Sequence, residues 1–322
     1  MAEFILTSVS GTILEQRGVD HLGPLRDLVG TWKGTGFNQI WRPHRIKGGG
    51  SGYGGRPGSN QDRFLELNET LETIEFKEIP GEIPNRGLLQ ADINLYGLTY
   101  MQEVSDAYAT APGQPPGAHP GIHLEPGIWL HVPLTTDPAN AQTVARLATI
   151  PHGTSILMQG RVFPPFNAPP SFAHESIVPF PIGNPGHTFP PGDFPEMNLS
   201  IPSAFRTPPQ DIPNVTQAWV DNPNVVLQNG LAGKHVISTT TLHIETKSAQ
   251  ITGGGTSNIS FLQGAAGGPN ADAARVDATF WIETVQLPDG ARKRQLQYTQ
   301  RVILDFNGLS WPHVSVATLE KI

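Results

Sequence analysis

Short segments rich in Val, Ile, Leu and Thr recur along the whole chain, and Gly, Pro and Asn separate them. Their length suits β-strands, and several alternate apolar with polar residues, as strands with one buried face do. Strands that follow one another through turns favour an antiparallel up-and-down arrangement. We predict an all-β fold, a single antiparallel up-and-down β-barrel of about ten or eleven strands. The expected strands cover residues 30–36, 67–76, 88–100, 122–133, 143–150, 155–163, 235–246, 256–262, 275–286, 294–306 and 310–322.

Residues 164–234 interrupt this pattern, because Pro, Phe, Gly and Asn dominate most of them. A structureless stretch of this length is unusual inside a compact domain. Its Phe, Ile and Met side chains also argue against a solvated linker. We predict one domain over residues 1–322, in which 1–29 form a leader and 164–234 an ordered, Pro-rich insertion that packs over the barrel as a lid. A mobile excursion is the alternative.

Charge and cysteine content exclude several classes of function. The formal net charge is −7 and no basic stretch stands out, so we expect neither nucleic acid nor a membrane surface as a partner. The chain has no cysteine, which excludes disulfides, zinc–thiolate sites and thiolate-ligated haem and suits a cytoplasmic protein. We find no signal peptide or membrane span. Nothing in the sequence defines the oligomeric state.

The expected strand at residues 122–133 has two different faces. One face carries His123, Glu125, Trp129 and His131, and the other is mostly apolar, with Leu124, Ile128, Leu130 and Val132. If the first face lines a cavity, His123, Glu125 and His131 are candidates for acid–base catalysis or for binding a non-haem metal. If it faces water, these are surface residues and the apolar face fills the core.

A second candidate site lies at the start of the last strand, where Pro312 precedes His313. Proline suits the entry to a strand, since it has no N–H to donate. A neutral imidazole is a good iron ligand, and in a chain without cysteine a histidine is the obvious axial ligand for haem. The alternative is a histidine at the rim of the barrel. His152, on the expected turn 151–153, is either solvated or overhangs the same pocket.

Four stretches, in this order, resemble the nitrobindin family of small haem-binding barrels, which are related to the fatty-acid-binding and lipocalin (calycin) barrels. The first resembles an opening Gly-x-Trp-x-Gly-x-Gly, the second a His-x-Glu-x-Gly strand, the third a central hairpin and the fourth a terminal Pro-His strand. They are Gly30-Thr-Trp-Lys-Gly-Thr-Gly36, His123-Leu-Glu-Pro-Gly-Ile-Trp129, Leu147-Ala-Thr-Ile-Pro-His-Gly153 with Gly160, and Pro312-His-Val-Ser-Val-Ala-Thr-Leu-Glu-Lys321.

The resemblance implies a calycin-like domain that binds haem b, with His313 as the proximal iron ligand and His123 lining the haem cavity. It also implies handling of nitric oxide, or isomerisation of peroxynitrite to nitrate. Trp32, Trp129 and His152 are further candidates for the pocket. The sequence departs from the family pattern where Ile128 replaces an aromatic residue and where His131 adds a histidine. The resemblance leaves out 48–62, 105–121, 163–234 and 264–274, so we expect a rebuilt pocket mouth.

Two other functions fit the same sequence. One is a haem-free barrel that binds a lipid or another small apolar molecule, favoured by the apolar insertion. The other is an enzyme of secondary metabolism that uses His123, Glu125 and His131 as acid–base groups or as ligands of a non-haem metal.

Overall fold

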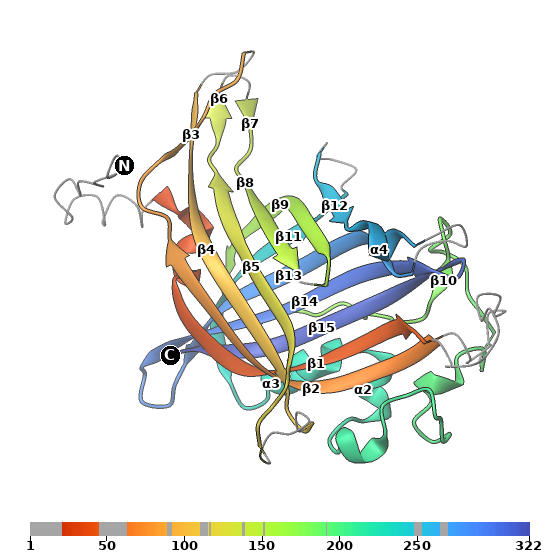
Figure 1. The fold of residues 1–322 in the computed structure, drawn as a ribbon. Helices are drawn as coiled ribbons and strands as arrows, with labels where there is room; N and C mark the ends of the chain where they lie inside the picture. Colours follow the sequence, from red (N-terminus) through yellow and green to blue (C-terminus); the bar gives the residue numbers. More distant parts are fainter. Residues whose placement is uncertain are drawn as a thin grey trace.

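A computed structural model of the chain describes residues 21–44, 63–88, 92–109, 115, 117–136, 139–150, 152–190, 192–247, 253–264 and 270–322. Ten antiparallel strands close into a barrel (Figure 1). Most of the leader and the stretch 48–62 lie outside the described residues. In ring order the strands are β1 (Gly30–Pro43), β2 (Arg63–Glu78), β4 (Ile93–Asp106), β5 (Gly121–Val132), β8 (Thr143–Ile150), β9 (Thr154–Phe166), β11 (His235–Glu245), β13 (Asp272–Gln286), β14 (Arg292–Phe306) and β15 (Leu309–Lys321).

The ring follows the order of the chain and closes where β1 pairs with β15, from Trp32 opposite Lys321 to Ile40 opposite His313. The predicted up-and-down barrel is therefore confirmed. The close contact of β1 with β15 explains why one of the β1 glycines, Gly36, is required. A Cβ on Gly36 would lie 2.4 Å from the carbonyl oxygen of Val316 on β15, so only glycine lets the strands approach this closely.

Short elements decorate the ring, and one of them corrects a predicted strand. Residues 256–262 divide into β12 (Gly255–Asn258), which pairs with β9, and a helical turn, α4 (Ser260–Gln263). The side chain of Asn258 ends the strand, because it accepts from Thr154 at 2.7 Å and donates to the carbonyl of Ala273 at 3.1 Å. The other short elements are β3 (Ile83–Asn85), β6 (Thr135–Thr136), β7 (Ala139–Asn140), β10 (Phe180–Pro181), η1 (Gly23–Leu28), η2 (Pro195–Met197), η3 (Pro209–Asp211), α2 (Gln217–Asp221) and α3 (Asn224–Gly230).

The 3₁₀ helix η1 fills one end of the barrel. Leu25 and Leu28 on η1 are fully buried in the main hydrophobic core. Trp32 packs in the same core, and its indole N–H donates to the carbonyl of Leu28 at 2.7 Å. Burial of this apolar surface stabilises the closed end. Open space inside the barrel therefore lies toward the opposite end.

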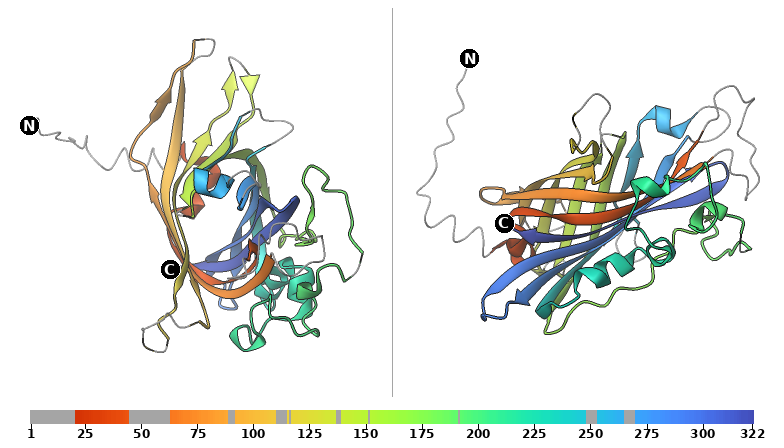
Figure 2. Two further views of the ribbon diagram at one scale, coloured as in Figure 1. Left: turned by 45° about the vertical axis from the view of Figure 1, so that its right-hand side comes forward. Right: turned by 90° about the horizontal axis from the view of Figure 1, so that it is seen from below.

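The insertion packs on the outside of the barrel and not across its mouth (Figure 2). A second buried cluster joins Ile177, Phe194 and Leu227 of the insertion to Trp41 and Trp311 on the outer wall. The insertion therefore does not form the expected lid over the barrel mouth, and instead packs against the outer surface of the barrel wall. The apolar insertion residues cover strand faces that would otherwise expose large aromatic side chains to water.

A buried ion pair fixes the insertion to β2. Arg63 donates to Glu196 of η2 at 3.1 Å, and both side chains are at most 1% exposed. The guanidinium also lies 4.7 Å from the ring centre of Phe194. A charge pair buried this deeply depends on both partners, so it commits the insertion to one position.

Glu283 on the outer wall of β13 is a buried carboxyl whose charge opposes folding. It accepts from the side chain of Gln295, and burial raises its pKa from 4.5 to about 8. The folded state therefore holds a proton that the unfolded state releases between these values. The contribution of Glu283 to stability falls as the pH rises through this range, by up to about 1.4 kcal/mol per pH unit.

We expect Glu283→Gln to remove this pH dependence and to stabilise the protein above pH 8. Urea unfolding of both proteins at a series of pH values measures the effect as a difference, in which other titrating groups cancel. Glu75→Gln, a change on the exposed face of β2, is the control. Parallel stability curves for wild type and Glu283→Gln would contradict the prediction.

Candidate ligand cavity

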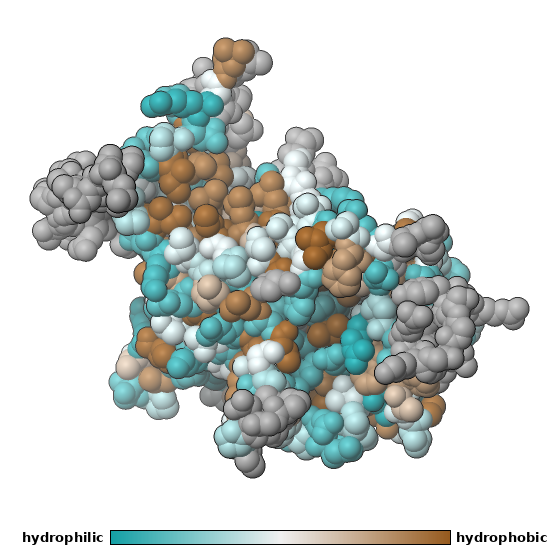
Figure 3. Space-filling model, in the orientation of Figure 1, coloured by the Kyte–Doolittle hydropathy of each residue, from teal (hydrophilic) through white to brown (hydrophobic). Residues whose placement is uncertain are grey.

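The two faces of β5 are arranged with the polar face inward. Glu125 and Trp129 are buried at 0% and 1% exposure, whereas Leu124 and Ile128 on the other face are 41% and 36% exposed. Apolar side chains of the neighbouring strands extend this outer surface, which Figure 3 shows as hydrophobic colouring over the same wall. The face of β5 that carries His123, Glu125 and His131 therefore turns toward the interior of the barrel.

A cavity of about 300 Å³ occupies the end of the barrel opposite η1. This volume is at the lower end of the range for small-molecule sites. Its walls are mainly apolar, and Leu262 of α4 and the nearby Ala271 border it on one side. The apolar lining residues are Ile40, Val104, Ile122, Ile150, Leu262, Ala271, Ala273, Val276, Val302 and Leu304.

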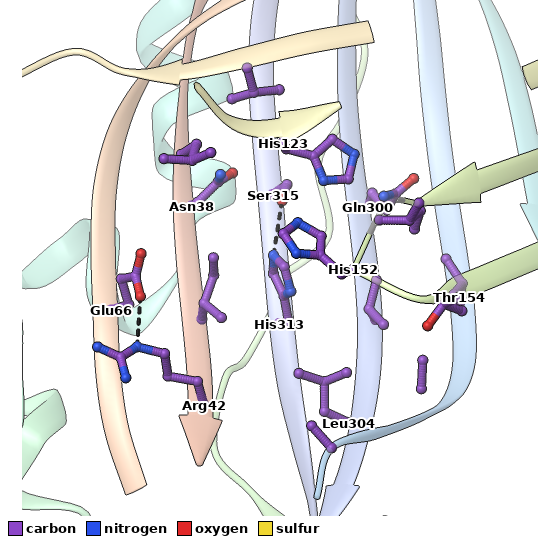
Figure 4. A pocket seen from close by; sticks show the side chains of 18 of the residues that line it. Asn38, Arg42, Glu66, His123, His152, Thr154, Gln300, Leu304, His313 and Ser315 are labelled. Carbon is purple, nitrogen blue, oxygen red and sulfur yellow. Dashed lines mark hydrogen bonds and ion pairs between the residues drawn. The ribbon is translucent and has the colours of Figure 1, made fainter. Parts of the chain in front are cut away.

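His313 points into this cavity from β15 (Figure 4). Desolvation inside the barrel, together with His123 and His152, lowers the pKa of His313 to about 3. The hydroxyl of Ser315, two residues along the same strand, lies 3.5 Å from its Nε2. At neutral pH the ring is an uncharged imidazole, the form that binds iron.

His123 and His152 lie together in the same cavity, with ring centres 5.8 Å apart. His152 comes from the turn between β8 and β9, and desolvation together with the nearby His123 lowers its pKa. His123 Nε2 lies 3.2 Å from Oε2 of Glu125. Within the described part of the chain, no three His, Asp or Glu side chains come together in a group that could hold a metal ion.

Glu125 lies below the cavity in a buried charge network. The guanidinium of Arg146 on β8 donates to its Oε1, and the hydroxyl of Tyr100 donates to the same oxygen. Burial alone would raise the pKa of Glu125, but Arg146 and His123 lower it to about 2. Arg146 also donates to Tyr100 at 2.8 Å and to Gln300 at 2.7 Å. The ionised Glu125 can therefore hold the ring of His123 in place.

The candidate residues from the sequence separate into two groups. His313, His123 and His152 line one cavity. Trp32 and Trp129 pack in the apolar core at the closed half of the barrel. These two residues do not line the cavity, because the side chains that fill the closed end come from the first half of β1 and the last half of β5.

His131 also lies at the closed end, away from the cavity. Its Nδ1 is 2.8 Å from the carbonyl oxygen of His21, and its Nε2 is 3.4 Å from the side-chain oxygen of Gln142. A Cβ on Gly23 would lie 2.7 Å from the imidazole, so the ring packs tightly against the start of η1. These contacts give His131 a structural role beside η1, at the end of the barrel opposite the cavity that His313 lines.

Sequence reasoning missed Arg146, Tyr298 and Glu72, which shape the cavity floor. Arg146 carries a signal that could have identified it. Arg146 lies on the same face of its strand as Val144, and a cation on a buried face needs an acidic partner. Tyr298 shares one face of its strand with Leu296 and Val302, and nothing local in the sequence connects it with Glu72 on β2.

Comparison of the chain with protein-family models, with curated proteins and with solved structures finds no match. The helices in the described residues are all too short or too polar to cross a membrane.

Proposed function

We propose that this barrel binds haem b with His313 as the axial iron ligand and handles nitric oxide, peroxynitrite or a related small oxidant. The observation that carries the proposal is the imidazole of His313, which points into an apolar-walled cavity with His123 and His152 in the same space. The resemblance to nitrobindins, which includes the terminal Pro312-His313, favours the same ligand.

The residues around the cavity fit this group. Haem requires apolar walls and an axial ligand, and the aliphatic lining of the cavity together with the imidazole of His313 supports the proposal on both counts. Arg42 lies at the cavity mouth with a side chain 43% exposed, where it can pair with a propionate in place of Glu66. Haem would supply an iron centre that binds nitric oxide or reacts with peroxynitrite.

The residues around the cavity would then have different roles. His313 would bind the iron, while the apolar walls would keep bulk water out of the cavity. His123, fixed by Glu125, presents a ring to any small molecule in the cavity and can hold or give a proton there. His152, whose pKa is lowered, is an uncharged hydrogen-bonding group beside it.

Haem titration of the wild type and of His313→Ala tests the axial ligand. We expect a sharp Soret band at one haem per chain in the wild type and its loss in the variant, partly restored by added imidazole. His243→Ala is the matched control, because His243 lies on the face of β11 opposite the core residues Leu242 and Ile244. Equal spectra for wild type and His313→Ala would refute the assignment.

The low pKa of His313 predicts an unusual pH dependence of haem binding. An ordinary histidine becomes protonated, and loses its ligand, as the pH falls through 6.5. His313 stays neutral down to about 3. We therefore expect the haem affinity to stay level through pH 6.5 for as long as the barrel remains folded. Soret absorbance measures the binding, and circular dichroism of the same samples measures the fold. A tenfold loss per pH unit below 6.5, with the fold intact, would contradict this.

A haem-free binding barrel is the second candidate, and the apolar lining of the cavity favours it. It predicts that native mass spectrometry of the isolated protein detects a bound organic molecule and no iron. The wild type would then give no Soret band under the titration described above.

A further inference from the structure

Glu72 on β2 is a second buried carboxyl beside the cavity, and its surroundings differ from those of Glu125. Its side chain is 4% exposed. Three uncharged groups donate to it: Tyr298 at 2.6 Å, Thr70 at 2.9 Å and Gln102 at 3.4 Å. Among the described residues, the ion pairs include Glu125 with Arg146 but none with Glu72.

The groups that face Glu72 come from every neighbouring strand. Tyr298 belongs to β14, Gln102 to β4 and Thr70 to β2 itself. On the β1 side the nearest residue is Gly36, where an added Cβ would lie 2.6 Å from the carboxyl. His123 on β5 is the titratable group that acts on it from a distance. Burial outweighs these interactions and raises the pKa of Glu72.

Tyr298 connects this acid to the cavity. Tyr298 and Gln102 both line the cavity, whereas Glu72 lies behind them. The amide of Gln102 donates to the Tyr298 hydroxyl at 2.9 Å. Burial raises the pKa of Tyr298 well above 10, so the phenol keeps a proton and can pass one only as it receives another.

We propose that Glu72 is a carboxylic acid that gives its proton, through the hydroxyl of Tyr298, to an oxyanion of a small molecule bound in the cavity. In the structure the Tyr298 hydroxyl donates to Glu72, so for the transfer it turns its O–H toward the ligand oxygen and accepts from the acid instead. The O–H bond of Glu72 then breaks as its proton moves to the Tyr298 oxygen, and the original Tyr298 proton moves to the ligand oxygen. Glu72 is left as a carboxylate that accepts from Thr70 and Gln102. The matching ligand is a phenolate or enolate whose apolar body fits the aliphatic walls. This inference does not depend on haem.

Two buried carboxyls in different states are an arrangement suited to acid–base chemistry. Glu125 is held ionised by Arg146 and positions His123, which can accept a proton. Glu72 is buried without a cation among its hydrogen-bond partners and backs Tyr298, which can donate one. His123 and Tyr298 both line the cavity, so a ligand placed between them can lose a proton to His123 and gain one from Tyr298.

Infrared spectroscopy of the protein as purified tests the protonation of Glu72. The wild type at neutral pH should show the C=O stretching band of a buried carboxylic acid. Glu283, whose pKa burial raises to about 8, contributes a similar band, so Glu283→Gln is the background in which the Glu72 band is read. In that background Glu72→Gln should lose the band, Tyr298→Phe should shift it, and Glu75→Gln, on the exposed face of the same strand, should leave it unchanged. A Glu283→Gln protein without such a band, or one whose band Glu72→Gln leaves unchanged, overturns the proposal.

The probe 4-nitrophenol tests the transfer, because its phenol and phenolate forms absorb at different wavelengths. At a pH where the free probe is phenolate, the wild type should convert bound probe to the phenol form and lose the part of the infrared band that belongs to Glu72. Tyr298→Phe and Glu72→Gln should leave the probe as phenolate. A phenolate spectrum unchanged by the wild type contradicts the proposal, and a normal Soret band in the haem titration would show that haem binding survives that failure.

Discussion

Replacement of Arg146 by methionine should lower the free energy of unfolding by about 3–5 kcal/mol, because it leaves the Glu125 carboxylate buried without a cation. Both side chains are at most 1% exposed, so water cannot take the place of the guanidinium. The variant also loses the hydrogen bonds to Tyr100 and Gln300. Methionine keeps the aliphatic part of the arginine side chain, so the loss reports the guanidinium group, with its charge and its hydrogen bonds. Urea unfolding measures it.

Two further variants separate this effect from general damage. In Arg146→Met with Glu125→Gln, the buried charge is gone, and most of the stability should return. Arg275→Met removes an exposed pair, since Arg275 is 45% exposed and lies 2.7 Å from Glu245. That change should cost at most about 1 kcal/mol. If Arg146→Met and Arg275→Met lower stability equally, the buried network does not act as described.

Trp41→Ala should cost about 3–5 kcal/mol, as large-to-small changes at fully buried aromatic positions do. Trp41 has no exposed surface and packs against Trp311 and Phe194. Its indole N–H donates to the carbonyl of Ile177 at 2.9 Å, which ties β1 to the insertion. The variant should therefore both unfold in less urea and expose the insertion to proteolysis.

Limited proteolysis with mass mapping measures the second effect. We expect the first cleavages in Trp41→Ala to fall within residues 167–234, several-fold faster than in the wild type. Phe163→Ala is the control, because Phe163 is 46% exposed on the outer wall. Its stability should stay within about 0.5 kcal/mol of the wild type. Cleavage of the insertion at the wild-type rate in Trp41→Ala would contradict the packing role.

The sequence predicted the barrel well because strand order and pairing follow local signals. Asn307-Gly308, a dipeptide typical of tight hairpin turns, joins β14 to β15, and Asn307 adopts a positive φ of 49° there. The alternation in β5 predicted two faces, but not which one turns inward. That choice depends on Arg146 from another strand, which makes the burial of Glu125 possible.

Other features of the site were beyond local reasoning. Tyr298 and Glu72 are 226 residues apart, and only the closure of the barrel brings them together. The insertion was expected to cover the mouth because of its apolar composition, yet composition does not indicate which surface it covers. The aromatic residues Trp41 and Trp311 on the outer wall decide this. His131 shares a face with His123, but barrel length places it at the opposite end.

The absorption spectrum of the wild-type protein with one equivalent of haem tests the central proposal most directly. A histidine-ligated haem in an apolar cavity should give a sharp, red-shifted Soret band that saturates at one haem per chain and is absent in His313→Ala. A broad spectrum like that of free haem, at every ratio of haem to protein, would contradict the account of His313 as an iron ligand.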